Sequence, residues 1–193
     1  MKNILILGAS GSLPKVVIPV LLQNPEIKLT LFARHTHELM PLADNRVTIV
    51  QGDATSLTQL EKILPGQDIV YANLAGQLET MAKNIVQAMH QQQLKRLIWI
   101  SSMGIYSETA TETDSILAPY RQSAKIIEDS DLNYTIIRPA WFTHDTEINY
   151  QLTHKGEAFQ GQQVSRHSIA NLINKLIQNP EYAVRESLGI AKV

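Results

Sequence analysis

The stretch Asn3-Ile4-Leu5-Ile6-Leu7-Gly8-Ala9-Ser10-Gly11-Ser12-Leu13-Pro14 joins an apolar run to a turn that contains two glycines, and an apolar segment follows it. The run predicts a buried strand, and the segment after the turn predicts a helix. Glycines at such a turn let the backbone bend sharply and approach a pyrophosphate, whose charge free amides and the helix dipole stabilise. The stretch therefore predicts the first strand-turn-helix unit of a dinucleotide-binding sheet.

Short apolar runs alternate with helix-period segments along the rest of the chain. The amphipathic stripes fall at Leu78, Met81, Ile85, Val86 and Met89, and at Ile169, Leu172, Ile173, Leu176 and Ile177. The expected strands are Asn3 to Leu7, Lys28 to Ala33, Arg46 to Gln51, Asp68 to Asn73, Arg96 to Ser101 and Asn133 to Pro139. This order predicts an α/β fold, a doubly wound parallel sheet with helices on both faces, in which the stripes belong to the core. Ligands of such a sheet bind beyond the carboxyl ends of the strands.

Length and composition narrow the function classes. The 193 residues suit one domain, with residues from about 140 to 193 expected to complete a small substrate cleft. Scattered basic residues and a net charge of -1 argue against nucleic acid, and the apolar runs are too short to cross a membrane. The absence of cysteine fits a reducing compartment, so we expect a cytoplasmic protein. The histidines show no metal-binding pattern, so no metal is expected.

Five motifs resemble those of the short-chain dehydrogenase/reductase superfamily; four lie at the ends of expected strands, and the fifth includes the last expected strand. They are Gly8-x-x-Gly11-x-x-Pro14, Gly52-Asp53-Ala54, Asn73-Leu74-Ala75-Gly76, Ser101-Ser102-Met103-Gly104-Ile105-Tyr106 and Asn133-Tyr134-Thr135-Ile136-Ile137-Arg138-Pro139-Ala140-Trp141. With the short length, they are similar to the NmrA-like atypical branch, which includes flavin- and biliverdin-reductase-like enzymes. The resemblance implies a Rossmann-like NAD(P)-binding domain. Its implied cofactor-binding residues are Gly8, Ser10, Gly11, Ser12, Leu13, Asp53, Ala54, Asn73, Leu74, Ala75, Ser101, Tyr120 and Pro139.

Two prolines depart from the family pattern in the first helix. Pro14 replaces the third glycine of the motif, and proline suits the first turn of a helix because its missing N–H needs no partner there. Pro19 lies deeper and is expected to kink the helix.

The end of the second strand favours NADP over NAD. It carries Arg34 and no acid, and a guanidinium pairs with a 2'-phosphate that a carboxylate would repel. NAD stays possible, since Arg34 could also be a solvated loop residue. The resemblance implies that Asp53 accepts a hydrogen bond from the adenine amine; the alternative is a helix cap for the segment that begins near Ser56.

The catalytic residues of the superfamily are a Ser, a Tyr and a Lys four residues after the Tyr. Here Tyr120 and Lys125 are five apart, which turns them about 140° from one another on a helix. The resemblance places Tyr120 at the family's lysine position and Ile116 at its tyrosine position, so both catalytic positions are substituted. Ser101, Ser102 and Tyr106 remain as candidate catalytic residues, with Tyr106 as the first candidate for a hydroxyl donor or, alternatively, a packed tyrosine.

The segments beyond the last predicted strand supply the substrate side. Trp141 and Phe142 would form an apolar wall for the substrate. Ser165 is expected to cap the last helix, and the adjacent Arg166 lies either toward the cleft or on the surface.

Three functions follow from these features. The first is an NADPH-dependent oxidoreductase that transfers hydride to a small or planar acceptor such as a quinone, a flavin or a carbonyl compound. The second is a non-catalytic NADP(H) sensor of NmrA type with a protein partner. The third, an NAD-dependent epimerase or dehydratase, is weakened because few residues remain for a sugar-binding lobe.

Overall fold

The computed structural model describes residues 1–107 and 114–193. All of the predicted strands form, and each end lies within one residue of its predicted position. They are β1 (Lys2–Leu7), β2 (Ile27–Ala33), β3 (Val47–Gln51), β4 (Ile69–Ala72), β5 (Arg96–Ile100) and β6 (Asn133–Pro139). These strands are parallel and lie in the order β3-β2-β1-β4-β5-β6. The order reverses between β1 and β4, which makes the edge beyond these two strands the expected ligand position.

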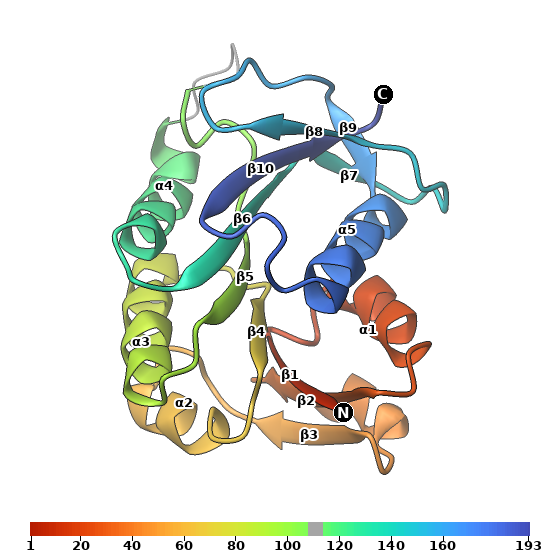
Figure 1. Cartoon of the computed structure of the whole chain (residues 1–193), viewed down its shortest axis with the longest axis vertical. Helices are drawn as coiled ribbons and strands as arrows, with labels where there is room; N and C mark the ends of the chain where they lie inside the picture. The colour runs from red at the N-terminus through yellow and green to blue at the C-terminus, as the bar shows by residue number, and fades with distance from the viewer. Residues whose placement is uncertain (108–113) are drawn as a thin grey trace.

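The helices cover both faces of the sheet, as predicted. α1 (Pro14–Leu22) and α5 (Arg166–Gln178) pack together on one face. The other face carries α2 (Leu57–Ile63), α3 (Leu78–Gln91) and α4 (Asp114–Glu128) (Figure 1). A 3-10 helix, η1 (His37–Leu42), joins β2 to β3.

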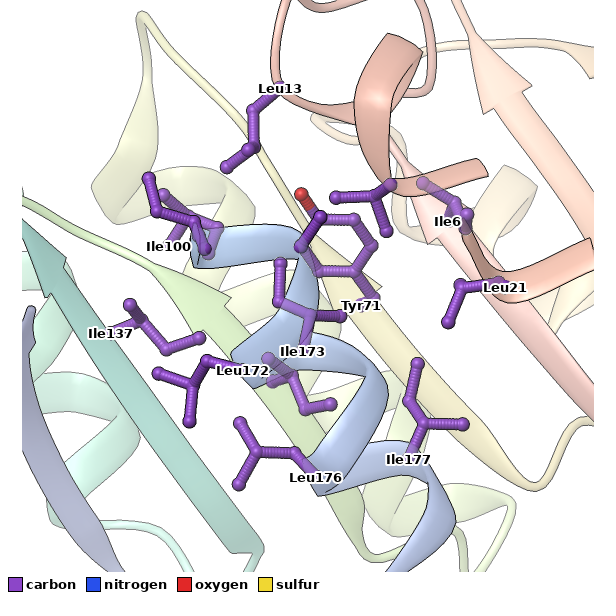
Figure 2. Packing of buried hydrophobic residues seen from close by; sticks show 14 of the residues in the cluster. Ile6, Leu13, Leu21, Tyr71, Ile100, Ile137, Leu172, Ile173, Leu176 and Ile177 are labelled. Carbon is purple, nitrogen blue, oxygen red and sulfur yellow. The ribbon is translucent and has the colours of Figure 1, made fainter. Parts of the chain in front are cut away.

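Each face of the sheet has its own hydrophobic core. Figure 2 shows the α5 side, where Leu172, Ile173, Leu176 and Ile177 point at Tyr71 and the neighbouring strand residues. Both predicted stripes are confirmed as core, because every member is buried except Val86. Val86 is partly buried and packs against the hydrophobic cluster between α3 and the sheet. Burial on both faces explains why the strands are apolar on consecutive residues.

Four further strands follow β6, and the sequence did not predict them. β10 (Glu186–Ala191) lies parallel to β6, and β8 (Gln151–His154) lies antiparallel to β10 at the edge of the sheet. β7 (Trp141–Thr143) and β9 (Gln163–Ser165) form a separate two-stranded sheet. These strands lie together with the start of α5 at one end of the molecule (Figure 1).

The prolines of α1 occupy different environments. Pro14 is the first residue of the helix and is buried, as its missing N–H permits. Pro19 is exposed, and the helix continues past it to Leu22. Among the described residues, no helix is long and apolar enough to cross a membrane.

Candidate cofactor and substrate site

The glycine loop packs tightly against the end of β4. Gly8 has φ of +77°, and a Cβ on it would lie 2.0 Å from the backbone oxygen of Asn73. A Cβ on Gly11 would lie 2.7 Å from the Asn73 side-chain nitrogen. The loop is also fixed to β2, because the Gly8 amide donates to the Phe32 carbonyl at 3.0 Å. These contacts hold the loop at the edge where the strand order reverses, and they leave no room for a side chain at Gly8.

The amides of this loop are available to a ligand. Within residues 1–107 and 114–193, the amides of Ser10, Ser12 and Leu13 donate no hydrogen bond to the protein. Leu13 precedes the first residue of α1, and no side chain caps that end of the helix. Free amides at a helix N-terminus favour an anion.

A cavity of about 350 Å³ opens above the glycine loop and extends along the carboxyl ends of β1, β2, β4 and β5. Its lining includes eleven of the residues predicted for the cofactor. These are Gly8, Ser10, Gly11, Arg34, Asp53, Ala54, Asn73, Leu74, Ala75, Ser101 and, from α4, Tyr120. Of the other predicted cofactor residues, Leu13 is buried beneath the loop and Ser12 is exposed beside it. Amides, a guanidinium and apolar walls along one groove fit a dinucleotide.

Arg34 and Asp53, the residues predicted to contact the adenosine part of the cofactor, both line this cavity. Arg34 is exposed directly after β2, and the Asp53 carboxylate is close enough that the arginine lowers its pKa slightly. The larger causes of the lowered pKa of Asp53 are the backbone amide and then the hydroxyl of Thr55, both of which donate to its Oδ1 at 2.9 Å. Asp53 therefore stays ionised as an acceptor at neutral pH. The cap of α2 is Ser56, which accepts from the Gln59 amide, so Asp53 does not fill that role.

A second cavity of about 360 Å³ continues from the first. Ser101, Tyr120 and Phe142 line both of them. The second is completed by Ser102, Met103, Pro139, Ala140 and Trp141. The predicted aromatic wall thus stands at the inner end of the cofactor groove, with Trp141 72% exposed and Phe142 37% exposed. Such broad apolar surfaces suit a flat ligand.

Ser101 has the one hydroxyl in this region that is buried and lacks a partner among the described residues. The residue is 6% exposed, and its Oγ makes no hydrogen bond. The Ser102 hydroxyl instead donates to the Met103 carbonyl at 3.1 Å. A buried hydroxyl without a partner costs free energy, and this one belongs to a residue that lines both cavities.

Tyr106 lies away from these two cavities. Its hydroxyl donates to Glu128 at 2.5 Å and lies 3.1 Å from the Ser187 hydroxyl, in a separate cavity of about 670 Å³. Burial, followed by the hydrogen bond to Glu128, raises the pKa of Tyr106 well above its ordinary value. The structure therefore separates Tyr106 from Ser101 and Ser102, the other predicted catalytic residues.

Lys125 also lies away from Tyr120, as the five-residue spacing predicts. It lines the same separate cavity as Tyr106, and its ammonium group pairs with Asp129 at 2.7 Å. Ile116, at the family's tyrosine position, is 67% exposed. Tyr120 is thus the tyrosine that lines both cavities, and Lys125 does not lie beside it.

Comparison with known proteins agrees with this geometry. The profile of the NAD(P)H-binding family matches residues 8–180. The chain belongs to this family. A search of the curated proteins finds no match for this NAD(P)H-binding protein.

Solved structures of similar proteins cover the whole chain. A Rossmann-fold NAD(P)-binding family protein from Shigella flexneri is 41% identical with a TM-score of 0.87, over 100% of this chain and 94% of that chain. A short-chain dehydrogenase/reductase of wide type from Veillonella parvula, solved in complex with NADP, is 27% identical with a TM-score of 0.91, over 99% and 94%. ChuY, an anaerobillin reductase from Escherichia coli O157:H7, is 16% identical with a TM-score of 0.87, over 99% and 97%, and shares the fold.

The NAD(P)H-binding site has further lining residues that the sequence did not predict. They are Phe32, Ala33, His35, Gly52, Met81, Ile100 and Met103. Most of them immediately precede or follow a predicted site residue in the sequence. A prediction that included the neighbours of each site residue would have contained them. Met81 comes from a helix stripe assigned to the core, and no motif distinguishes it.

Proposed function

We propose that the protein is an NADPH-dependent oxidoreductase that acts on a small or planar acceptor without the usual Tyr-x-x-x-Lys pair. One observation carries the proposal: the dinucleotide groove and the apolar second cavity meet at Ser101, Tyr120 and Phe142. In this proposal residues 1–193 form one NAD(P)-binding domain, and the segment from about 140 completes the substrate cleft.

The roles of the site residues follow from their positions. Bound NADPH supplies the hydride. The loop amides hold the diphosphate, Arg34 pairs with the 2'-phosphate, and Asp53 accepts from the adenine amine. The wide-type reductase, which binds NADP, supports the choice of NADP over NAD.

The second cavity orients the acceptor. Trp141 and Phe142 stack on a flat quinone, flavin or carbonyl compound. The Ser101 hydroxyl donates a hydrogen bond to the acceptor oxygen or nitrogen, where negative charge develops, and the Tyr120 hydroxyl lies at the same junction. Alignment of two bound reactants lowers the barrier without a dedicated acid.

A non-catalytic NADP(H) sensor is the second candidate. The observation that favours it is the position of Lys125, which lines the separate cavity of Tyr106 and pairs with Asp129 instead of lying beside Tyr120. A sensor would bind the cofactor in the same groove and pass its redox state to a protein partner.

Calorimetric titration with NADPH, NADP, NADH and NAD, followed by an NADPH-oxidation screen with quinones, flavins and dicarbonyls, tests the proposal. We expect tight NADPH binding and turnover of at least one acceptor. For that acceptor, Ser101→Ala should lower turnover about 100-fold. The variant should keep its melting temperature, since the hydroxyl has no partner in the fold.

The other outcomes discriminate between the candidates. Binding of NADPH without turnover of any acceptor would favour the sensor. No binding of any dinucleotide would contradict both candidates.

A further inference from the structure

Arg166, the first residue of α5, reaches the glycine loop from the far end of the chain. Its Nε donates to the Ser12 hydroxyl at 3.4 Å, although 154 positions separate the two residues. Ser12 lies in the glycine loop, where the amides of Ser10, Ser12 and Leu13 donate to no other part of the described chain. The guanidinium is thus held beside the place where the loop accepts an anion.

Two further contacts fix the direction of this side chain. Nη1 donates to the Thr143 carbonyl at 2.8 Å, and the guanidinium carbon lies 5.0 Å from the centre of the Phe142 ring. The stacking leaves the edge of the planar guanidinium free to donate hydrogen bonds. Among residues 1–107 and 114–193, no carboxylate forms an ion pair with Arg166.

A neighbouring lysine is already engaged. Lys15, in the first turn of α1, pairs with Glu38 at 2.7 Å. The loop therefore combines free amides with one guanidinium that has no acid partner, and this is the chemistry that binds a diphosphate.

We propose that Arg166 binds the diphosphate of the nicotinamide dinucleotide, opposite the amides of the glycine loop. The inference rests on the proposed function and adds a ligand from the C-terminal helix. Because Arg166 also stacks on Phe142, cofactor binding would fix one wall of the second cavity before the acceptor enters. Arg166 is thus a binding residue for the cofactor and a positioning residue for Phe142.

The test compares three ligands by calorimetry in wild type and in Arg166→Gln. NADPH and 2'-phospho-ADP-ribose both carry the diphosphate, whereas adenosine 2'-monophosphate lacks it. We expect the variant to bind both diphosphate ligands about 10- to 100-fold more weakly, by the same factor, and adenosine 2'-monophosphate unchanged. The loss should shrink as salt is raised, because salt screens an exposed charge pair.

Two further variants keep the test decisive. Arg166→Lys keeps the charge and should recover part of the affinity for both diphosphate ligands, even if the Gln variant is unstable. Phe142→Leu removes the stacked ring and keeps the guanidinium. It should therefore affect 2'-phospho-ADP-ribose less than Arg166→Gln does.

Three results would overturn the inference while leaving the proposed function intact. In the first, Arg166→Gln binds both diphosphate ligands as wild type does. In the second, it loses affinity for NADPH alone, which would mean that Arg166 acts through the substrate wall. In the third, its affinity for adenosine 2'-monophosphate falls by the same factor as its affinity for the diphosphate ligands, which would indicate a general distortion of the site. Failure of the wild type to bind NADPH would overturn both proposals.

Discussion

Arg34 is the residue that we propose selects NADP over NAD. It follows β2 directly and lines the groove beside Asp53, where the adenine ribose of a dinucleotide would lie. No acid stands between Ala33 and Thr36 to accept from a 2'-hydroxyl. The proposed preference for NADP therefore depends on one exposed side chain.

Replacement of Arg34 by Ala should weaken NADPH binding about 10- to 100-fold, because a charge-assisted pair with the 2'-phosphate is lost. NADH binding should change little. Lys28→Ala is the matched control, since Lys28 is an exposed cation at the other end of the same strand. The measurement is the dissociation constant of each dinucleotide by calorimetry. Equal losses for NADPH and NADH would remove Arg34 from cofactor selection.

The direction in which a side chain points could not be predicted from the sequence. Ser101 and Tyr106 are five positions apart, and both were predicted to lie near the nicotinamide. The backbone between them turns, so Ser101 faces the cofactor groove while Tyr106 points toward β10. Position after a strand predicts which edge of the sheet a residue occupies, and it does not predict which cavity the side chain enters.

At the scale of elements, consecutive apolar residues predicted the strands that are buried on both faces. β8 and β10 were not predicted, because they are strands through their pairing with each other and with β6, and not through their residue pattern. β8 reads Gln-Leu-Thr-His, and β10 contains Gly189, where a Cβ would lie 2.6 Å from the Phe159 ring. Neither pattern is typical of a buried strand. The loop after β1 was predictable because glycine spacing, strand and helix all indicated one arrangement.

Gly8→Ala tests the close packing of the glycine loop, between β1 and α1, against the end of β4. The variant should lose about 2 to 4 kcal/mol of unfolding free energy, since an L side chain is strained at φ of +77° and its Cβ would meet the Asn73 carbonyl. Gly66→Ala is the matched control: its φ is +80°, with nothing within 4 Å of an added Cβ. It should lose only about 1 to 2 kcal/mol.

Urea denaturation measures both losses, and NADPH titration of the folded variants adds a second readout. Gly8→Ala should bind NADPH much more weakly than Gly66→Ala, because the displaced loop no longer presents its amides. Similar stability losses in the two variants would show that the contact with Asn73 adds no strain beyond the backbone conformation.

At the scale of the whole molecule, a cluster around Tyr106 ties the C-terminal strands to the rest of the sheet. Its hydroxyl contacts Glu128 of α4 and Ser187 of β10, and Lys155 pairs with Glu128 at 2.8 Å and stacks on the tyrosine ring. The buried guanidinium of Arg138 on β6 stacks on the same ring and donates to Ser187 at 3.1 Å. These contacts join segments that are far apart in the chain, which is the role expected of a structural network.

Tyr106→Phe should therefore lower the unfolding free energy by about 1.5 to 3 kcal/mol, because a hydrogen bond to a charged partner is lost. The affinity for NADPH and the turnover should stay at wild-type values, since Tyr106 lies outside both functional cavities. Urea denaturation and steady-state kinetics measure the two effects. A stable variant with reduced turnover would return Tyr106 to the mechanism.

The pH dependence of stability gives an independent check on Tyr106. Its pKa is raised in the fold, so above pH 10 the unfolded chain releases the phenolic proton while the folded protein retains it. Folding then binds a proton, and stability falls as the pH rises beyond the ordinary tyrosine pKa. Wild type should lose stability more steeply than Tyr106→Phe in this range, measured by urea denaturation at a series of pH values. Parallel curves for the two proteins would show that Tyr106 titrates normally and that the hydrogen bond to Glu128 does not hold its proton.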